Sequence, residues 1–340
     1  LSILKIYMKK IFKQVLIIFL FIQTTQANSE EVSFENWLNS FKIYALKKGI
    51  SEKTFNKSMS KVKFNPKVIE YDRFQPEFYE DTKTYIDKRT SKRKVRDAIK
   101  IYKKNKILID EIEKKFSVEK ELLLALMGIE TNFGTYLGKM DILSSLATLS
   151  YDKRRRDFFT NELIIILLLI EKDVIDHNIL FGSWAGAFGN FQFMPSTIKN
   201  YAIDYDNNDI IELKKIEDSF ASAANYIKKI GWKKNQLCFK KVTLSNKIPK
   251  KYLNTSAKKI KNKTKFNNIK KYIDNYEKLN FQYNDIIGLI TPDKDIIPEA
   301  ENLSPAYLTF ENYELILKWN RSLRFALAVC TLKEKISNEL

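Results

Sequence analysis

The chain has 340 residues, of which 44% are hydrophobic and 29% charged. This is enough apolar material for one large domain or two to three small ones, which excludes disorder as the dominant state. Lysine and arginine total 59 against 41 acidic residues, and the net charge of +18 favours an anionic partner: nucleic acid, acidic lipid or an acidic cell-wall polymer. One histidine and two cysteines exclude a Cys/His zinc centre. Acid–base chemistry should therefore rest on carboxylates.

The N-terminal segment has the pattern of a secretory signal peptide. Lysines precede an apolar run over residues 15–22, and small residues around Ala27 precede a polar stretch. The run is shorter than the roughly 20 residues that span a bilayer. We therefore expect residues 1–27 to be cleaved after Ala27, with a retained anchor as the alternative. Export to the periplasm makes an envelope polymer a more suitable partner than nucleic acid, and it permits a disulfide between Cys238 and Cys330, which the sequence leaves open.

Helical spacing dominates the chain up to about residue 235. We expect an N-terminal helical domain over residues 28–100 and a second helical region over residues 101–235. In that region Ser117 has the position of an N-cap, with acidic residues in the turn that follows. The fully apolar run 163–170 is too short for a membrane span, so it predicts a buried core helix.

The pattern changes in the last third of the chain. Residues 236–312 contain short β-rich runs, several prolines and a lysine-rich insert near 257–280, which predicts a small α/β subdomain. Residues 313–340 return to helical spacing. The expected fold class is α+β and predominantly α.

Glu130 is the main candidate for an acid–base group. On the helix expected from about residue 118, Leu123, Met127 and Glu130 fall on one face, so the carboxylate lies in an apolar stripe near a helix C-terminus. Desolvation and the negative end of the helix dipole both disfavour the charged form, and they should raise its pKa as a general acid requires. Taken alone, this spacing is more typical of a glutamate at the solvent edge of a core stripe.

A second cluster covers residues 182–196, where small residues, aromatic residues and amides alternate. Such a loop lets a polymer approach the backbone, and Ser183 and Gln192 could donate hydrogen bonds to sugar or acetamide groups. Seven of the nine glycines fall between residues 128 and 231, which marks a region of unusual backbone conformation. A tight helix-to-helix connection would explain the glycines but not the aromatic residues.

In this order the segments resemble the lytic murein transglycosylase B family. The matching pieces are Gly128-Ile129-Glu130-Thr131-Asn132-Phe133-Gly134, the run ILSSLATLS at 142–150, the pair Arg155-Arg156, the loop 182–197 and residues 223–232. The matching order extends from about residue 85 to 329. The resemblance implies a lysozyme-like helical catalytic core over residues 101–235, a flanking helical domain, a small β-containing insertion over 236–312 and a C-terminal helix over 313–340 that returns to the groove.

The resemblance also implies an activity. The family members are peptidoglycan lytic transglycosylases, which cleave the β-1,4 bond between N-acetylmuramic acid and N-acetylglucosamine and leave 1,6-anhydro ends. Glu130 matches the family's single acid/base, so no second carboxylate and no cofactor would be needed, and the partner would be a glycan strand of peptidoglycan. The positions that match substrate-binding residues are Tyr85, Arg155, Arg156, Ser183, Gln192, Tyr226 and Asn320.

Some positions depart from the family pattern. Phe133 replaces a usual tryptophan, and Trp319 and Phe325 stand where tyrosines are common. Each keeps an aromatic surface, but polar atoms are lost at some of them. Asn190-Phe191 replaces smaller or polar residues before the glutamine. The resemblance therefore leaves the subsite preferences in doubt.

A loop after residue 203 is similar in part to a calcium-binding loop. Asp204, Asp206 and Asn208 place oxygen atoms at positions 1, 3 and 5, and the Ile210 carbonyl stands at position 7. The standard pattern then fails, and the family's longer loop would take Asp218 as its last ligand. A structural Ca²⁺ ion and an Asx-rich surface turn explain the loop equally well.

Other functions stay open on the residues alone. A hydrolytic muramidase would use the same acid with Asp141 or Asp152 as its second carboxylate. A non-catalytic peptidoglycan-binding protein would keep the groove but would not need Glu130, Ser183 and Gln192 together. A nucleic-acid binder conflicts with the export signal. A peripheral position at a membrane and contacts with other cell-wall enzymes are both compatible with the sequence.

Two further features favour ordinary structural roles. His177 lies at an expected helix end, where an imidazole commonly caps the last carbonyls. The lysine run 258–271 is typical of a solvated face, and binding of an anionic glycan or a teichoic-type polymer is the functional alternative.

Overall fold

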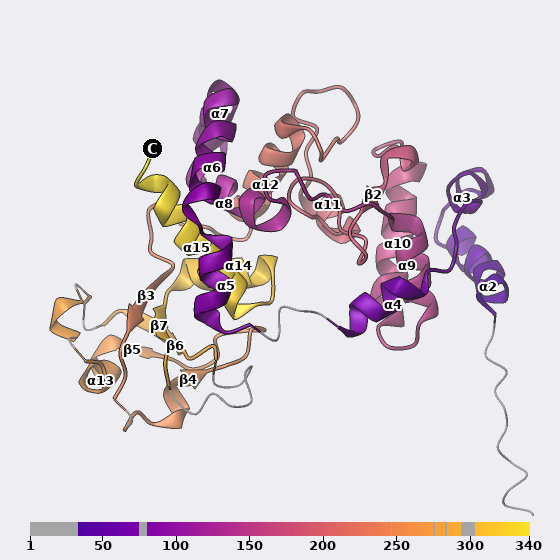
Figure 1. Ribbon diagram of the computed structural model, residues 1–340. Helices are drawn as coiled ribbons and strands as arrows, with labels where there is room; N and C mark the ends of the chain where they lie inside the picture. The colour runs from indigo at the N-terminus through magenta and orange to yellow at the C-terminus, as the bar shows by residue number, and fades with distance from the viewer. Residues whose placement is uncertain are drawn as a thin grey trace, which may run out of the picture. The chain divides into compact units, whose positions relative to one another are not determined.

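The computed structural model describes residues 33–74, 80–245, 247–274, 276–279, 281–282, 284–293 and 303–340 (Figure 1). The chain divides into two compact units, the first ending at Ile43 and the second running from Tyr44 to Leu340. The boundary falls inside the first described helix, α2 (Phe34–Lys47). The expected signal peptide lies outside the described residues. Within the described ranges, no helix has both the length and the hydropathy that a membrane span requires.

Short, individually capped helices precede the core of the larger unit. They are α3 (Glu52–Met59), α4 (Pro66–Arg73), α5 (Thr82–Arg89), α6 (Lys92–Lys104) and α7 (Lys106–Phe116). Ser51, Asp81 and Ser91 each accept the backbone N–H of the residue three positions later and so begin α3, α5 and α6. Pro66 starts α4, where its missing N–H removes no hydrogen bond. These caps explain why this lysine-rich stretch forms several short helices.

The core of the larger unit consists of apolar helices. Its elements are α8 (Lys120–Thr131), β1 (Met140–Asp141), α9 (Ile142–Tyr151), α10 (Arg156–Glu171), η2 (His177–Ile179), β2 (Phe181–Gly182), α11 (Pro195–Tyr201) and α12 (Ile216–Lys229). The predicted core helix is confirmed, because residues 163–170 of α10 are buried except for a half-buried Leu168. The carboxylate of Asp141 accepts the Ser144 N–H at 2.6 Å and caps α9, and β1 pairs antiparallel with β2.

Two of the expected caps are wrong. Ser117 has a left-handed backbone (φ 58°) and ends α7, and Glu119 is the residue that precedes α8. Serine is favoured at N-caps, whereas left-handed helix ends usually carry glycine or asparagine, so the residue type at position 117 pointed to the wrong role. His177 does not cap α10, which ends at Glu171, and instead begins η2.

Glu119 ties three distant segments together. Its buried carboxylate accepts Trp232 Nε1–H at 2.6 Å and the Asn235 N–H at 3.0 Å, and it forms an ion pair with Lys333 at 3.0 Å. Burial alone would raise the pKa of Glu119, but the Lys333 ammonium and the two N–H donors outweigh burial and hold the pKa below its usual range.

The β-containing insertion is a small mixed sheet with short helices. Its strands are β3 (Phe239–Val242), β4 (Leu253–Asn254), β5 (Lys263–Lys265), β6 (Ile286–Ile290) and β7 (Ala306–Thr309); the short helices are η3 (Lys250–Tyr252), α13 (Phe266–Ile269), η4 (Lys270–Tyr272) and η5 (Tyr276–Lys278). The strand order is β3-β7-β6-β4, and β5 also pairs with β6. Phe266, Ile269, Ile287, Leu289 and Leu308 form most of its apolar core.

The chain ends in α14 (Glu311–Trp319) and α15 (Leu323–Ser337), and α15 packs against α8 and α5 (Figure 1). Cys238, next to β3, forms a disulfide with Cys330 of α15, and their Cα atoms lie 6.2 Å apart. The disulfide that the sequence left open is therefore formed, and it joins the insertion to the C-terminal helix. The predicted α+β, predominantly α class is confirmed.

Candidate active site

Glu130 lies in the last turn of α8, where the chain reverses sharply. Asn132, Phe133 and Gly134 all have left-handed backbones, with φ of 49°, 60° and 80°. Thr131 fixes the reversal, because its hydroxyl donates to the Asn190 carbonyl at 2.8 Å. The expected apolar stripe is present, because Leu123 and Met127 are buried and Glu130 is half-buried.

Gly128 explains how Phe133 folds back on α8. A Cβ atom at Gly128 would lie 2.6 Å from Cζ of the Phe133 ring, so only glycine leaves room for that ring. The half-buried ammonium of Lys94 donates to the Gly128 carbonyl and lies 6.0 Å from the Phe133 ring centroid. Burial lowers the pKa of Lys94. Sequence reasoning missed this lysine, because its contact joins α6 to α8 across 34 residues.

The carboxylate of Glu130 is held by Trp319, which the sequence identified only as a departure from the family pattern. Trp319 Nε1–H donates to Glu130 Oε1 at 2.8 Å, across a separation of 189 residues. Trp319 is the last residue of α14, and Asn320, another predicted site residue, directly follows it. The Asn320 side chain is half-buried. The structure thus brings Glu130, Trp319 and Asn320 together at the end of α14.

Aromatic rings surround the Trp319 indole. Tyr226 of α12 stacks on it with centroids 4.9 Å apart and planes 18° apart. Phe191 and Phe193 meet it edge-on at 6.3 and 5.4 Å. Tyr201 stacks on the other face of Tyr226 at 4.2 Å. The glycine-rich loop therefore supplies its aromatic residues to the surroundings of the candidate acid.

Ser183 and Gln192 lie in the same loop, and both make backbone contacts there. The Ser183 hydroxyl accepts the Ala187 N–H at 3.0 Å, so its own O–H is available as a donor. Gln192 has a left-handed backbone (φ 50°), and its amide donates to the Gly189 and Leu137 carbonyls at 3.0 and 3.3 Å. The Gln192 N–H groups thus hold the loop in shape.

The predicted arginines lie where α9 meets α10. Arg155 pairs with the buried carboxylate of Asp72 at 3.2 Å, and its guanidinium lies over the Phe159 ring at 4.7 Å. Arg156 is exposed and donates to the Tyr151 carbonyl at 2.8 Å. Of these two arginines, Arg155 has a carboxylate partner, and Arg156 forms no ion pair within the described part of the chain.

Tyr85 does not lie on a groove surface. It is 1% exposed, and the Arg89 guanidinium covers its ring at 3.6 Å. A side chain this buried does not line an open groove, so the low exposure of Tyr85 disagrees with the expected substrate contact. The sequence could not reveal this, because α5 packs against α15, which lies more than 200 residues later in the chain.

The two candidate second carboxylates are engaged elsewhere. Asp141 caps α9 through the Ser144 N–H. Asp152 forms an ion pair with Arg73 at 2.9 Å. Each carboxylate already has a structural role, so neither resembles a group reserved for activating water.

The loop after residue 203 brings three carboxylates together. Single oxygen atoms of Asp204, Asp206 and Asp218 lie within 4.8 Å of one another. Asp218 is fully buried in the first turn of α12 and accepts the N–H groups of Tyr205 and Glu212 at 2.8 and 2.7 Å. Desolvation and the charges of Asp218 and Asp204 raise the pKa of Asp206. Oxygen ligands of this kind suit Ca²⁺.

The other two predicted ligands belong to the same loop. Asn208 donates to Asp206 at 3.0 Å, and its Oδ1 accepts the Ile210 N–H at 2.9 Å. Glu212, which sequence reasoning missed, accepts a hydrogen bond from the Asn208 amide at 3.2 Å. The loop is thus ordered around its acidic side chains, and the donor set is compatible with a bound cation.

Comparison with known proteins agrees with these features. Residues 33–334 match the transglycosylase SLT domain family. A segment of 120 residues, 35% of this chain, is 42% identical to the membrane-bound lytic murein transglycosylase B of Escherichia coli (strain K12) and spans 33% of that relative's length.

Solved structures show the same fold. SltB3 from Pseudomonas aeruginosa, in complex with NAG-anhNAM-pentapeptide, is 28% identical with a TM-score of 0.77, over 90% of this chain and 80% of that one. The Escherichia coli lytic transglycosylase Slt35, in complex with calcium, is 23% identical with a TM-score of 0.73, over 93% and 95% of the two chains. The lysozyme-like fold implied by the sequence is thus confirmed. The chain belongs to the transglycosylase SLT domain family.

Proposed function

We propose that this chain is a peptidoglycan lytic transglycosylase with Glu130 as its single acid/base. The observation that carries the proposal is the Glu130 carboxylate, half-buried among aromatic rings and held by the Trp319 indole. The family match over residues 33–334 supports it, and so does the muropeptide bound to the related SltB3.

In the proposed reaction Glu130 first donates a proton and later accepts another. The protonated carboxyl donates to the glycosidic oxygen between N-acetylmuramic acid and N-acetylglucosamine, and the bond breaks at the muramyl C1. The substrate acetamide assists in place of a second carboxylate, an exception to the paired-carboxylate rule. The ionised Glu130 then takes the proton of the muramyl C6 hydroxyl, whose oxygen bonds to C1. No water is consumed, so the summed product mass equals the substrate mass.

The geometry of the carboxyl group suits this sequence. Trp319 donates to Oε1 and so orients the carboxyl group for the proposed proton transfer. After transfer the same N–H stabilises the carboxylate. The engaged positions of Asp141 and Asp152 favour this route over a hydrolysing muramidase, which needs a second carboxylate to activate water.

Substrate contacts are proposed for four other residues near the acid or at the α9–α10 junction. Ser183 keeps a free O–H donor, and Asn320 lies beside Trp319. Gln192 shapes the loop and offers its carbonyl oxygen to the sugar. Arg156, exposed at the start of α10, is suited to a lactyl or stem-peptide carboxylate. Arg155 would need to share its guanidinium with Asp72 to do the same.

A structural Ca²⁺ ion is proposed in the loop after residue 203. The ligands would be Asp204, Asp206, Asn208, the Ile210 carbonyl and Asp218. The converging carboxylates support it, and the related Slt35 was crystallised in complex with calcium. The ion would hold the loop against the first turn of α12 and take no part in the chemistry.

Export to the periplasm is proposed with cleavage after Ala27. The Cys238–Cys330 disulfide supports an oxidising compartment. The strong positive charge of the chain suits a wall polymer that carries carboxylates.

Mass spectrometry of the muropeptides released from purified peptidoglycan tests the function. We expect anhydromuropeptides from the wild-type protein and a loss of at least about 1,000-fold in Glu130→Gln, because the acid/base supplies both proton transfers. Reducing-end products, heavier by one water, would make the protein a muramidase. No release, with binding to the wall intact, would leave a binding protein.

A further inference from the structure

We propose that Tyr226 and Tyr201 are positioning residues that hold the Trp319 indole against Glu130, and that Tyr226 is not a substrate contact. This inference rests on the proposed function of Glu130. Three rings from α11, α12 and α14 stack in a row: Tyr201 on Tyr226 at 4.2 Å and Tyr226 on Trp319 at 4.9 Å, with interplanar angles of 18° in both pairs. We call these residues the aromatic ladder.

The ladder leaves no face of Tyr226 for a sugar. A sugar ring stacks on the flat face of an aromatic side chain, and here Tyr201 covers one face and Trp319 the other. The Tyr226 hydroxyl also has a partner, because it donates to the Lys318 carbonyl at 3.2 Å. Burial raises the pKa of Tyr226 to about 12. Its ring and hydroxyl both contact the end of α14, which carries Trp319.

Further contacts fix the tilt of the Trp319 indole as well as its position along the stack. Phe193 meets both Trp319 and Tyr226 edge-on, at 5.4 and 6.0 Å. Asn225 donates to the Tyr201 carbonyl at 2.8 Å, which joins the far end of the ladder to α12. The indole therefore cannot tilt or slide without breaking a ring contact. Its N–H stays directed at Glu130 Oε1.

The indole N–H sets the charge preference of the acid. An indole N–H is a donor only, so its hydrogen bond to a carboxylate is stronger than that to a neutral carboxyl. It therefore favours the ionised form of Glu130. Displacing the indole should raise the pKa of Glu130 and shift the basic limb of the kcat/KM profile to higher pH.

The first test is nuclear magnetic resonance of the indole N–H groups. The chain has four tryptophans, and Trp319→Phe assigns the resonance of Trp319. We expect that resonance to titrate with pH, and the titration to vanish in Glu130→Gln. Tyr226→Ala should shift or broaden it, and Tyr226→Phe should restore it. An unchanged resonance in Tyr226→Ala would overturn the ladder, whatever the activity of the protein.

Kinetics separate positioning from substrate binding. A positioning role predicts that Tyr226→Ala lowers kcat about 10-fold with KM within about twofold, since one hydrogen bond to a charged group is involved. Tyr226→Phe should recover most of kcat, and Tyr201→Leu should reproduce part of the loss. A raised KM with unchanged kcat would instead make Tyr226 a substrate contact. Tyr272→Ala, in the β-containing insertion, is the matched control for removing a half-buried tyrosine.

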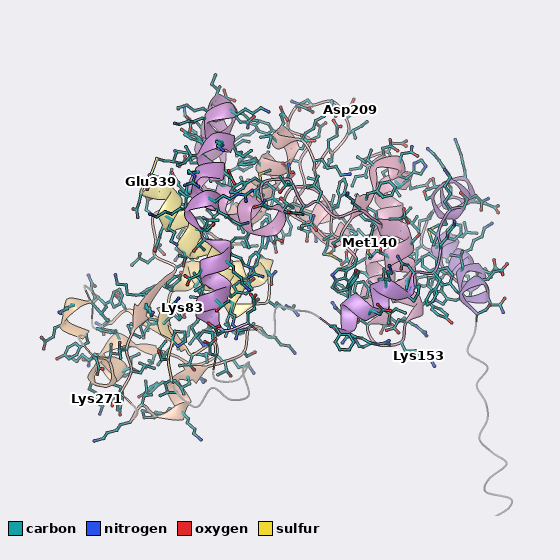
Figure 2. The ribbon with its side chains drawn as sticks, viewed as in Figure 1. Lys83, Met140, Lys153, Asp209, Lys271 and Glu339 are labelled. Carbon is teal, nitrogen blue, oxygen red and sulfur yellow. A yellow bond between two sulfur atoms is a disulfide. The ribbon has the colours of Figure 1, made fainter. Side chains whose placement is uncertain are left out.

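A separate observation carries a second inference: we infer that one edge of the insertion binds the surface of an anionic phospholipid bilayer. Residues 250–271 hold nine lysines and no acidic residue. We call this segment the basic edge. It comprises η3, β4, β5, α13 and η4, and both of its strands pair with β6. Figure 2 shows Lys271 at the outer margin of this part of the structure.

Most charges of the basic edge lack a carboxylate partner. Within the described part of the chain, Lys263 of the edge forms an ion pair with Glu314. The ammonium groups without a carboxylate within ion-pair distance in the described part of the chain are those of Lys250, Lys251, Lys258, Lys259, Lys261, Lys265 and Lys271. Such a concentration of like charge raises the self-repulsion of the fold unless an anionic partner neutralises it.

The composition of the edge favours a lipid surface over a discrete ligand. Lysine acts as a flexible point charge, whereas a built carboxylate or phosphate site uses the guanidinium fork of arginine, which is absent from residues 250–271. Ile286 is 56% exposed and lies directly opposite Lys265 in the β5–β6 pair. The lysines lie 5.2 and 5.1 Å over tyrosine rings in two pairs, Lys251–Tyr252 and Lys271–Tyr272. Basic, aromatic and apolar groups together are typical of a bilayer interface.

Vesicle binding of the full chain tests the basic edge. The readout is the excess of binding to phosphatidylglycerol vesicles over phosphatidylcholine vesicles, because any apolar segment of the chain contributes to both. We expect Lys258→Gln/Lys259→Gln/Lys261→Gln to lower that excess at least about 10-fold, at roughly 1 kcal/mol per lysine. Salt should lower it as well.

The matched control removes three exposed lysines from α6 and α7. Lys103→Gln/Lys104→Gln/Lys114→Gln makes the same change in net charge away from the edge. Equal losses in the two triple variants would overturn the inference, since net charge alone would then be responsible. Binding to lipid-free peptidoglycan that is lost in the edge variant, without any vesicle binding, would also overturn it and assign the edge to the wall.

Discussion

At the scale of single residues, the proposed chemistry depends on the hydrogen bond from Trp319 to Glu130. A carboxyl group that acts first as acid and then as base must keep one oxygen directed at the substrate in both states. The indole N–H occupies Oε1 and so removes one of the two orientations of the group. A phenol at this position could both donate and accept, whereas an indole can only donate.

This difference gives a prediction for Trp319→Phe. Removing the donor should lower kcat about 10-fold to 100-fold, the equivalent of a hydrogen bond to a charged group of about 1.5–3 kcal/mol. The basic limb of the pH–rate profile should move to higher pH, because the ionised form of Glu130 loses its partner. Trp319→Tyr, which returns a donor, should recover part of the rate. An unmoved pH profile in Trp319→Phe would contradict the role of the N–H.

The residue scale is also where the sequence was most and least informative. Glu130 could be predicted, because its apolar stripe and its motif are local. Its partner Trp319 could not, because the contact spans 189 residues and depends on where α14 ends. Tyr85 and Tyr226 were both expected at the groove. The covering of Tyr85 by Arg89 and the stacking of two rings on Tyr226 have no signature in the nearby sequence.

At the scale of secondary-structure elements, buried carboxylates at helix N-termini form hydrogen bonds and an ion pair with other segments of the chain. Glu119 before α8 bonds the 232–235 turn and Lys333 of α15. Asp218 at the start of α12 bonds the loop after residue 203. The helices themselves follow from apolar spacing and caps, which is why the α+β class was predictable. The Asp218 contacts span 6 and 13 residues, but those of Glu119 span 113 to 214 residues, which no local sequence window contains.

Glu119→Gln should destabilise the protein by about 3 kcal/mol, because it leaves the half-buried Lys333 ammonium and the two N–H donors without the buried carboxylate. The pKa of Glu119 is below its usual range in the folded protein. Its contribution to stability is therefore complete above the ordinary glutamate pKa and is lost as the pH falls through the lowered one. Urea unfolding at pH 7 and in the acid range measures both effects. The variant should lose less stability on acidification than the wild type.

Glu121→Gln is the control for this change on the same helix. Glu121 is only half-buried, and its contact with Lys120 is long, at 3.9 Å. Its effect should stay below about 1 kcal/mol. Equal losses in the free energy of unfolding of the two variants would show that the contacts of Glu119 stabilise the protein no more than those of Glu121.

The calcium loop makes a second prediction at this scale. Added Ca²⁺ should raise Tm, because a ligand that binds only the folded chain stabilises it. Asp218→Asn should remove the shift, since Asp218 is the one fully buried carboxylate of the three. Asp209→Asn changes an exposed acid of the same loop and should keep it. A Tm that Ca²⁺ leaves unchanged in the wild type would favour the Asx-rich turn.

At the scale of the whole molecule, one disulfide joins the insertion to the catalytic part. It closes a loop across a separation of 92 residues that contains all five strands of the insertion and α14. Two cysteines in a chain with an expected export signal made this pairing plausible, but only the folded chain brings their Cα atoms to 6.2 Å. The charge of the molecule is unevenly placed as well, with nine lysines in the basic edge.

Removing the disulfide should cost about 4 kcal/mol in the free energy of unfolding, mainly by freeing the unfolded chain. Cys238→Ser/Cys330→Ser, compared with the wild type in urea with and without a reductant, measures it. The reductant should lower the stability of the wild type and leave the double variant unchanged. A double variant as stable as the oxidised wild type would contradict the predicted contribution.

The position of Trp319 has a consequence for the order in which the protein is made. Glu130 leaves the ribosome 189 residues before its indole partner. A nascent or truncated chain that ends before α14 carries the acid without this donor. The closed loop that holds α14 is also completed only when Cys330 oxidises. The contact between Glu130 and Trp319 therefore forms only after α14 has been made, and the loop that contains α14 is closed only in the oxidised chain.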